Sequence, residues 1–367
     1  MKNILLSIVL IALAIGCSSS DNSETNNTSK GYDRNAILSN WADNIIIPAY
    51  ENYTAKVTIL SDKAAALTAA ADEGKLAEVR AAWLEAYIAY QYVAMYDIGK
   101  ATELYLKQSA NTYPTDVAAI QANITSGNYN FNLPSQYSKQ GFPALDYLLN
   151  GQGNDSQTVS FLSTTNSAAY LNAVINQIKM IATTVTSDWK NSYRNQYVNN
   201  NGTSVSSSVN KTTNNFIKNL EKDIRSSKLG IPSGVFSNGT TFANKVEAYY
   251  KNDVSRTLLN AGIQAEIDFF NGKTFNSSAT GASLKSALDD TNAVRENKNL
   301  SNIINDQFQA SLVANNALSN SFSQQITSDN TKMLAAYAAL QRNVVYLKVD
   351  MMQALNITID YVDGDGD

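Results

Sequence analysis

The side chains that could do acid–base or metal chemistry in this chain are carboxylates, tyrosines, lysines and hydroxyls, because none of its 367 residues is histidine. Imidazole is the usual general base near neutral pH and the commonest metal ligand in proteins. Its absence excludes a Ser-His or Cys-His relay and every His-ligated metal site. Any chemistry must therefore come from the oxygen and amine groups that remain.

Asp146 is the first carboxylate of interest, because it follows the segment Gly141-Phe142-Pro143, which suits the start of a helix. An acidic side chain near that start would be favoured by the positive end of the helix dipole. Asp146 therefore has two open interpretations, a structural charge at a helix start and a ligand-binding group. All four residues are candidates for a ligand site.

A helix face rich in aromatic residues supplies further candidates. Trp83, Tyr87 and Tyr90 recur at steps of three and four residues, so they share one helix face. Core packing and an aromatic binding platform both agree with this spacing. Arg80 lies one turn before Trp83, where its guanidinium could hold an acidic ligand or form a structural ion pair.

The last residues alternate aspartate with glycine. Asp363, Asp365 and Asp367 copy the first three ligand positions of a calcium-binding loop. The turn glycine and bidentate glutamate of such a loop do not follow in this sequence. The segment is therefore expected to be either an acidic tail or a weak Ca²⁺ site.

The first residues predict export and a lipid anchor. Lys2 precedes an apolar run over residues 4–15, which is too short to span a bilayer and is typical of a signal peptide. Gly16-Cys17 at its end resembles the processing site of bacterial lipoproteins, which implies a lipidated Cys17. A plain secretory signal is the alternative. Asp21 and Glu24 resemble surface-export signals, so we expect an anchor in the outer membrane, on its periplasmic or surface face.

Composition excludes several partners and fold classes. The formal net charge is -4 and no basic cluster is present, which argues against nucleic acid and anionic lipid as partners. Cys17 is the one cysteine, so no disulfide framework is expected. Only 5 prolines, together with Ala-, Leu-, Asn- and Gln-rich stretches, favour helices.

Apolar residues recur at steps of three and four in six segments, which predicts amphipathic helices. The segments are 41–67, 75–108, 170–197, 242–265, 304–322 and 337–355. Pro48 is expected to kink the first of them. Narrow apolar stripes suit helices packed in bundles, so the predicted fold class is all-α.

Breaks in this periodicity divide the chain. A polar tether over 18–32 is expected to be disordered, because residues 18–31 contain no apolar side chain. Loops are expected at 109–140, 199–204 and 230–234. The resulting domain, 33–367, comprises a helical half at 33–200, a helical half at 205–358 and an acidic tail at 359–367.

Several segments, in order, resemble the imelysin family, a group of bacterial cell-envelope proteins that includes insulin-cleaving membrane proteases. The matching segments are 44–50 (NIIIPAY), 80–83 (RAAW) with Tyr90, 141–151 (GFPALDYLLNG), and 347–359 with 363–367. The third is similar to the family signature Gly-x-His-x-x-Glu-Tyr-Leu-Leu-x-Gly. The resemblance implies two four-helix-bundle-like halves packed together, with a pocket between them.

The departures from the family pattern bear on activity. Pro143 stands at the signature histidine and Asp146 at the signature glutamate. An acidic position beyond Tyr90 aligns with Ala94, and a basic position with Tyr87. The resemblance therefore implies a metallopeptidase site that lacks at least one essential group.

Three functions remain open. The favoured hypothesis is a non-catalytic envelope lipoprotein that binds a small ligand, a metal or an envelope protein, with a role in iron or haem acquisition. Direct iron binding would need oxygen ligands such as Asp146 and Tyr90. The alternatives are an atypical peptidase of the family and a glycan- or surface-protein-binding lipoprotein, the latter suggested by the 20 tyrosines.

Overall fold

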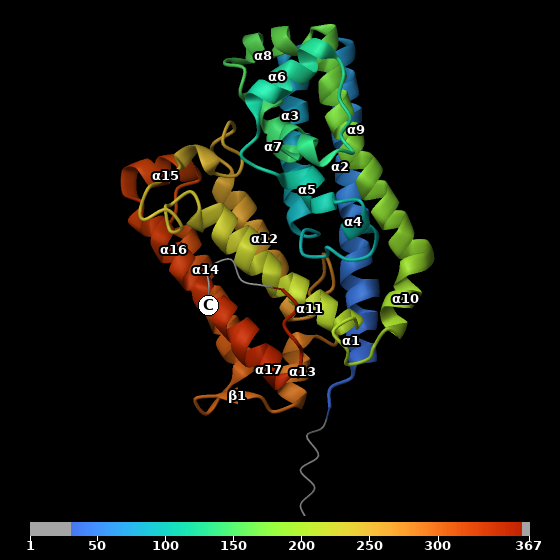
Figure 1. Ribbon diagram of the computed structural model, residues 1–367, viewed down its shortest axis with the longest axis vertical. Helices are drawn as coiled ribbons and strands as arrows, with labels where there is room; N and C mark the ends of the chain where they lie inside the picture. The colour runs from blue at the N-terminus through green and yellow to red at the C-terminus, as the bar shows by residue number, and fades with distance from the viewer. Residues whose placement is uncertain (1–30, 362–367) are drawn as a thin grey trace, which may run out of the picture. The chain divides into compact units, whose positions relative to one another are not determined.

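The computed structural model describes residues 31–361, and nearly all of their regular structure is helical, as the all-α prediction requires (Figure 1). Cys17, residues 18–30 of the predicted tether, and Asp363, Asp365 and Asp367 lie outside the described residues. Tyr32, at the end of the predicted tether, donates a hydrogen bond from its hydroxyl to the Leu355 carbonyl oxygen at 3.2 Å.

The first half of the domain, residues 33–200, is organised around three long helices that run side by side (Figure 1). These are α2 (Ile47–Ala69), α3 (Glu73–Gln91) and α9 (Thr165–Asp188). The remaining elements are α1 (Arg34–Asn40), η1 (Trp41–Ile46), α4 (Lys100–Glu103), α5 (Leu106–Asn111), α6 (Val117–Ser126), η2 (Pro134–Lys139), α7 (Gly141–Asn150), α8 (Asp155–Leu162), η3 (Trp189–Tyr193) and α10 (Arg194–Asn199).

The second half, residues 205–358, packs α16 (Thr331–Val345) against α14 (Leu300–Asn316) and η4 (Asn219–Gly230), while α12 (Ser255–Phe270) packs on α3 of the first half. Its other helical elements are α11 (Ser208–Lys218), η5 (Ala243–Lys245), α13 (Leu284–Asp290), α15 (Phe322–Asp329), η6 (Tyr346–Met351) and α17 (Met352–Ala354). A short antiparallel pair, β1 (Val294–Arg295) and β2 (Lys298–Asn299), pairs Val294 with Asn299.

Pro48 does not break the first long helix. It occupies the first turn of α2, directly after the wider π-helical turns of η1. Proline lacks the backbone N–H that an inner helical turn would use, and a local change of helical pitch accommodates this loss. The sequence predicts a kink at Pro48. The structure has the π-helical segment η1 just before this proline, within a continuous helical run from Arg34 to Ala69.

Two predicted helical stripes are confirmed over their whole length. Residues 170–197 lie in the consecutive helices α9, η3 and α10, and residues 337–355 lie in α16, η6 and α17 with Leu355 as its cap. The stripe that begins at residue 75 is shorter than expected. Helix α3 ends at Gln91, and Gly99 adopts a φ of 57° before the short helix α4.

The predicted loop at 109–140 contains a helix. The Asp116 side chain accepts a hydrogen bond from Ala119 N at 3.0 Å and so caps the start of α6, and Gly127 ends that helix with a φ of 64°. This cap-and-glycine pattern is a sequence signal for a helix of that length. The expectation of a loop was wrong because α6 has only 10 residues, too few turns for a long apolar stripe, and lies between Pro114 and Gly127.

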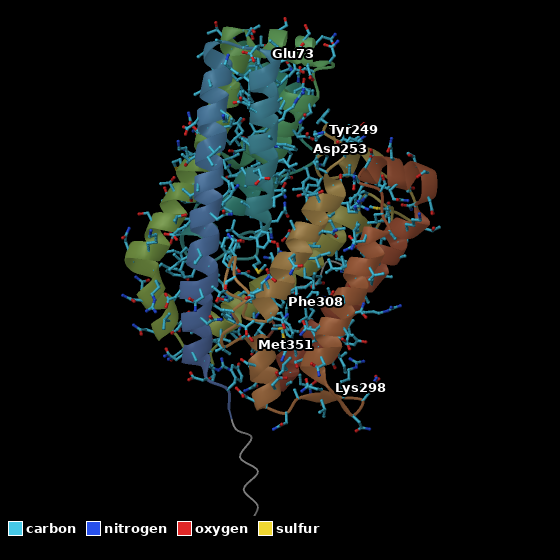
Figure 2. All side chains as sticks on the ribbon, turned by 180° about the vertical axis from the view of Figure 1, so that it is seen from behind. Glu73, Tyr249, Asp253, Lys298, Phe308 and Met351 are labelled. Atoms are coloured by element: carbon cyan, nitrogen blue, oxygen red, sulfur yellow. The ribbon has the colours of Figure 1, made fainter. Side chains whose placement is uncertain are left out.

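The predicted helix over 242–265 begins late. Residues 246–254 are not helical, and α12 starts at Ser255. Ala248 and Asn252 adopt positive φ values of 56° and 62°, which no helix accommodates. This stretch, which we call the 246–254 loop, includes Tyr249 and Asp253 (Figure 2). Among residues 31–361, no helix is both long enough and apolar enough to cross a lipid bilayer.

Candidate functional site

Helix α7 begins at Gly141, as the sequence predicts, and only glycine fits there. Gly141 has a φ of 80°, and a Cβ atom at this position would collide with the backbone carbonyl oxygens of Ser109 and Ala110 at the end of α5. Positive φ and close backbone contact both favour glycine. Pro143 then lies in the first turn, where its missing N–H costs nothing.

Asp146 connects the two halves of the domain. Its carboxylate accepts hydrogen bonds from Tyr250 N to Oδ2 at 2.8 Å and from Lys251 N to Oδ1 at 2.9 Å, both in the 246–254 loop. The Asn150 side chain donates a third bond to Oδ1 at 3.1 Å. We call the pair of backbone bonds the Asp146 clasp. Asp146 lies beyond the first turn of α7 and is 1 % exposed, so the interpretation as a charge at a helix start was wrong.

Burial controls the protonation of Asp146. Removal from water raises the pKa of this carboxyl from 3.8 to about 7. The three hydrogen bonds and the charge of Lys251 lower the pKa, but their combined effect is smaller than that of burial. The carboxyl is therefore expected to change its protonation state near neutral pH.

Pro143 and Asp146 line a cavity of about 190 Å³ between the two halves, which we call the signature chamber. Other residues that line it come from the segment after α5 and from the second half: Tyr113, Pro114, Asn244, Val246, Tyr249 and Tyr250. Three of these side chains are tyrosines. The chamber is therefore an aromatic cavity with a buried carboxyl in one wall.

Arg80 forms the structural ion pair that was one of its two predicted roles. Its Nε donates to the Leu149 carbonyl oxygen at 2.9 Å, and its Nη1 donates to Asp155 Oδ1 at 2.6 Å. These bonds join α3 to the end of α7 and the start of α8. Arg80 lines none of the cavities described here.

Trp83 and Phe142 belong to the core, and both side chains have no exposed surface. Trp83 Nε1 donates a hydrogen bond to the Phe142 carbonyl oxygen at 3.1 Å. The Phe142 ring stacks on Tyr87, with ring centroids 4.6 Å apart and an interplanar angle of 9°. Core packing, rather than an aromatic platform, is thus the role of these rings.

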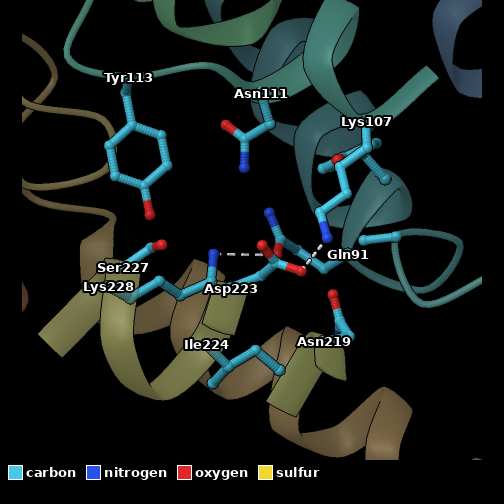
Figure 3. Close-up of a pocket in the computed structure, with 11 residues that line it drawn as sticks. Gln91, Lys107, Asn111, Tyr113, Asn219, Asp223, Ile224, Ser227 and Lys228 are labelled. Carbon is cyan, nitrogen blue, oxygen red and sulfur yellow. Dashed lines mark hydrogen bonds and ion pairs between the residues drawn. The ribbon is translucent and has the colours of Figure 1, made fainter. Parts of the chain in front are cut away.

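Tyr90 lines a different cavity from Asp146. This second cavity, of about 60 Å³, lies between α3 and α5 of the first half and η4 of the second, and we call it the polar chamber (Figure 3). Its polar lining residues are Tyr90, Gln91, Lys107, Asn111, Tyr113, Asn219, Asp223, Ser227 and Lys228. Tyr113 lines both chambers. The structure therefore does not bring Tyr90 and Asp146 together as iron ligands.

Buried charges beside the polar chamber were not predicted from the sequence. Lys228 forms an ion pair with Glu247, and their side chains are 4 % and 2 % exposed. Lys228 Nζ also donates to Gln91 Oε1 at 3.0 Å, and Asn111 Nδ2 donates to Glu247 Oε1 at 2.8 Å. Such bonds offset part of the desolvation cost of a buried pair. No sequence signal marks this pair, because neither residue stands in a recognisable motif.

A second ion pair crosses the polar chamber between the halves. Lys107 of α5 pairs with Asp223 of η4 (Figure 3). Both side chains are partly exposed, at 22 % and 31 %. Ala94, which aligns with an acidic position of the imelysin pattern, lines the same chamber without a charge.

The residues present do not fit the metal site of a metallopeptidase. Pro143 has no ligand atom, and both oxygens of Asp146 already accept backbone N–H groups. Across residues 31–361, no three Asp, Glu, His or Cys side chains lie close enough together to hold an ion. The aspartates predicted as a weak Ca²⁺ site lie outside this range.

Comparison with known proteins agrees with this architecture. The family model described as Imelysin matches residues 46–348. A solved structure from Parabacteroides distasonis ATCC 8503, called an iron-regulated protein A precursor, aligns with a TM-score of 0.70 at 17 % identity, over 87 % of this chain and 95 % of that chain. An imelysin-like protein from Psychrobacter arcticum 273-4 aligns with a TM-score of 0.62 at 15 % identity, over 89 % and 97 %. No curated protein matches the sequence.

Proposed function

Because this chain belongs to the imelysin family, we propose that it is a non-catalytic binding protein of the cell envelope, with its ligand site between the two helical halves. One observation carries the proposal. The carboxyl at the position of the signature glutamate, Asp146, is bound to the backbone N–H groups of Tyr250 and Lys251.

Catalysis by this carboxyl would require a free oxygen that can reach a substrate proton. Each oxygen of Asp146 instead accepts a backbone bond that fixes the 246–254 loop against α7. Pro143, at the position of the signature histidine, can neither ligate metal nor transfer a proton. The signature segment therefore fixes the 246–254 loop, which forms one wall of the signature chamber. This arrangement supports ligand binding.

The proposal extends to location and role. Cys17, acylated after signal cleavage, would anchor the protein in the outer membrane. A role in iron or haem acquisition is supported by the likeness to the Parabacteroides distasonis structure that is called an iron-regulated protein A precursor. The phenol oxygens of Tyr113, Tyr249 and Tyr250 around the signature chamber are hard donors of the kind that suit iron.

A second candidate ligand is a glycan. The rings of Tyr113, Tyr249 and Tyr250 line the signature chamber beside the Asn244 amide. Aromatic faces with adjacent amide and hydroxyl groups suit a sugar ring, which presents both apolar and hydroxyl surfaces.

The test compares the wild-type mature protein with Asp146→Asn and with Asp62→Asn, an exposed carboxylate on α2 as control. We expect no hydrolysis of unfolded protein substrates by any of the three. Equilibrium dialysis should show retention of ferric iron or haem by the wild type and by Asp62→Asn, weakened in Asp146→Asn.

Two results would overturn parts of this proposal. Hydrolysis that disappears in Asp146→Asn and persists in Asp62→Asn would make Asp146 catalytic. Retention of glycans that is insensitive to chelators, with neither iron nor haem retained, would replace iron acquisition by glycan binding.

A further inference from the structure

The polar chamber has space for a small ligand. Its volume of about 60 Å³ corresponds to roughly four to six water-sized groups. Residues of both halves form its walls, and none of them belongs to the signature segment 141–151. A ligand in the polar chamber would therefore contact none of the signature residues.

Hydrogen-bond donors remain available in this chamber. Lys228 Nζ has three N–H groups and two partners within residues 31–361, Gln91 and Glu247. Lys107 Nζ has one partner there, Asp223, and two further N–H groups (Figure 3). Each ammonium group can donate to a ligand carboxylate, but its own partner carboxylate, Asp223 or Glu247, already neutralises its charge.

Tyr113 adds a neutral donor. Figure 3 shows its hydroxyl pointing into the chamber, and that hydroxyl has no hydrogen-bond partner in the described part of the chain. Burial, together with the nearby charges of Glu247 and Asp223, raises the pKa of Tyr113 well above its ordinary value. The hydroxyl therefore keeps its proton.

The side-chain oxygen of Asn219 supplies a hydrogen-bond acceptor that no described donor satisfies. Its Nδ2 donates to Glu266 Oε1 at 2.6 Å, which directs Oδ1 toward the chamber (Figure 3). Asn219 is 3 % exposed, and Oδ1 has no hydrogen-bond partner among the described residues. A buried acceptor of this kind requires a donor from a ligand or from water.

We propose that the polar chamber binds a small carboxylate that carries a hydrogen-bond donor on its α-carbon, as 2-hydroxy acids and 2-amino acids do. The ligand carboxylate accepts from Lys107, Lys228 and Tyr113, and the α-substituent donates to Asn219 Oδ1. Acetate satisfies only the first requirement, and a simple amine satisfies only the second. The size of the chamber matches glycolate and glycine, each with five non-hydrogen atoms, that is, about five water-sized groups.

This inference deepens the proposed binding function and rests on it, since it names the ligand class of one chamber at the same interface. The two can fail separately, because Asp146 does not line the polar chamber. Lys107 lines the polar chamber and not the signature chamber, so Lys107→Met should weaken binding of glycolate and glycine and leave retention of iron or haem unchanged.

Isothermal titration calorimetry of the mature protein with glycolate, glycine, acetate and methylammonium tests the inference. We expect binding of glycolate, glycine or both. Glycolate alone would indicate an α-hydroxyl ligand, and glycine alone an α-ammonium ligand. Acetate should bind at least about fivefold more weakly, because it leaves the buried acceptor Asn219 Oδ1 without a donor, and methylammonium should give no heat.

Variants identify the chamber as the place of binding. Lys107→Met and Tyr113→Phe should each weaken binding, the former by at least about tenfold. Tyr113→Phe removes a single hydroxyl and keeps the ring, so it reports on the site even if Lys107→Met proves unstable. Lys218→Met, at the end of α11 and outside the chamber, is the matched control.

Three results would overturn the inference: no heat with glycolate and glycine, equal affinities for acetate and for the α-substituted acids, or unchanged affinity in Tyr113→Phe and Lys107→Met.

Discussion

The pH dependence of the free energy of unfolding should reveal the raised pKa of the Asp146 carboxyl directly. Its pKa lies at about 7 in the folded chain and near the ordinary value of 3.8 in the unfolded chain. A carboxyl whose pKa is raised by folding stabilises the fold fully below the unfolded pKa, and this contribution is lost as pH rises through the folded pKa. Its loss is therefore expected between pH values of about 4 and 7.

The size of this effect follows from the two pKa values. A difference between 3.8 and about 7 corresponds to about 4 kcal/mol in the free energy of unfolding. In Asp146→Asn the side chain does not titrate, so this variant should lack that part of the pH dependence. At pH below 4 the amide replaces a neutral acid but meets two backbone donors, which should destabilise the variant by about 1–3 kcal/mol.

Urea denaturation followed by circular dichroism, at several pH values from about 3 to 8, measures both quantities. The wild type should lose stability relative to Asp146→Asn as pH rises from about 4 to 7, and the difference should level off above that. Asp62→Asn, an exposed position, should follow the wild type at every pH. A difference between wild type and Asp146→Asn that stays constant over this range would refute the reasoning, because it would mean that Asp146 remains ionised in the fold.

Two further substitutions test the architecture. Gly141→Ala places a Cβ atom at a positive φ and against the backbone of α5, so it should reduce the free energy of unfolding by at least about 2 kcal/mol. Urea denaturation measures this change, and an unchanged value would show that α7 can shift away from α5. Lys228→Met leaves Glu247 buried without its cation and should cost about 3–5 kcal/mol. Addition of Glu247→Gln should recover part of that loss in the same assay, and failure of the double variant to exceed the single one would argue against charge burial as the cause.

Long stripes of apolar residues made the helical architecture predictable. The run 170–197 has an apolar residue at each turn and forms a nearly continuous helical rod. The prediction was wrong where local backbone geometry overrides the stripe. Ala248 and Asn252 adopt positive φ values, although Phe242, Val246 and Tyr250 continue the helical spacing. No local residue pattern marks the alanine for this conformation.

The sequence predicted the kind of role that some site residues take, but not their partners. The spacing of Arg80 and Trp83 allowed an ion pair and core packing, and both were found. The partners of Asp146 lie 104 and 105 residues along the chain and are backbone groups, so their identity leaves no trace in the sequence. The pairing of Lys107 with Asp223 likewise depends on the docking of α5 against η4.

The Asp146 clasp also places an unequal constraint on sequence change. Its donors are backbone N–H groups, so every residue except proline supplies them at positions 250 and 251. Its acceptors come from one side chain, and only a short carboxylate offers two of them at that distance from α7. Substitution at position 251 can therefore leave both donors in place, whereas the two acceptors depend on the single residue Asp146.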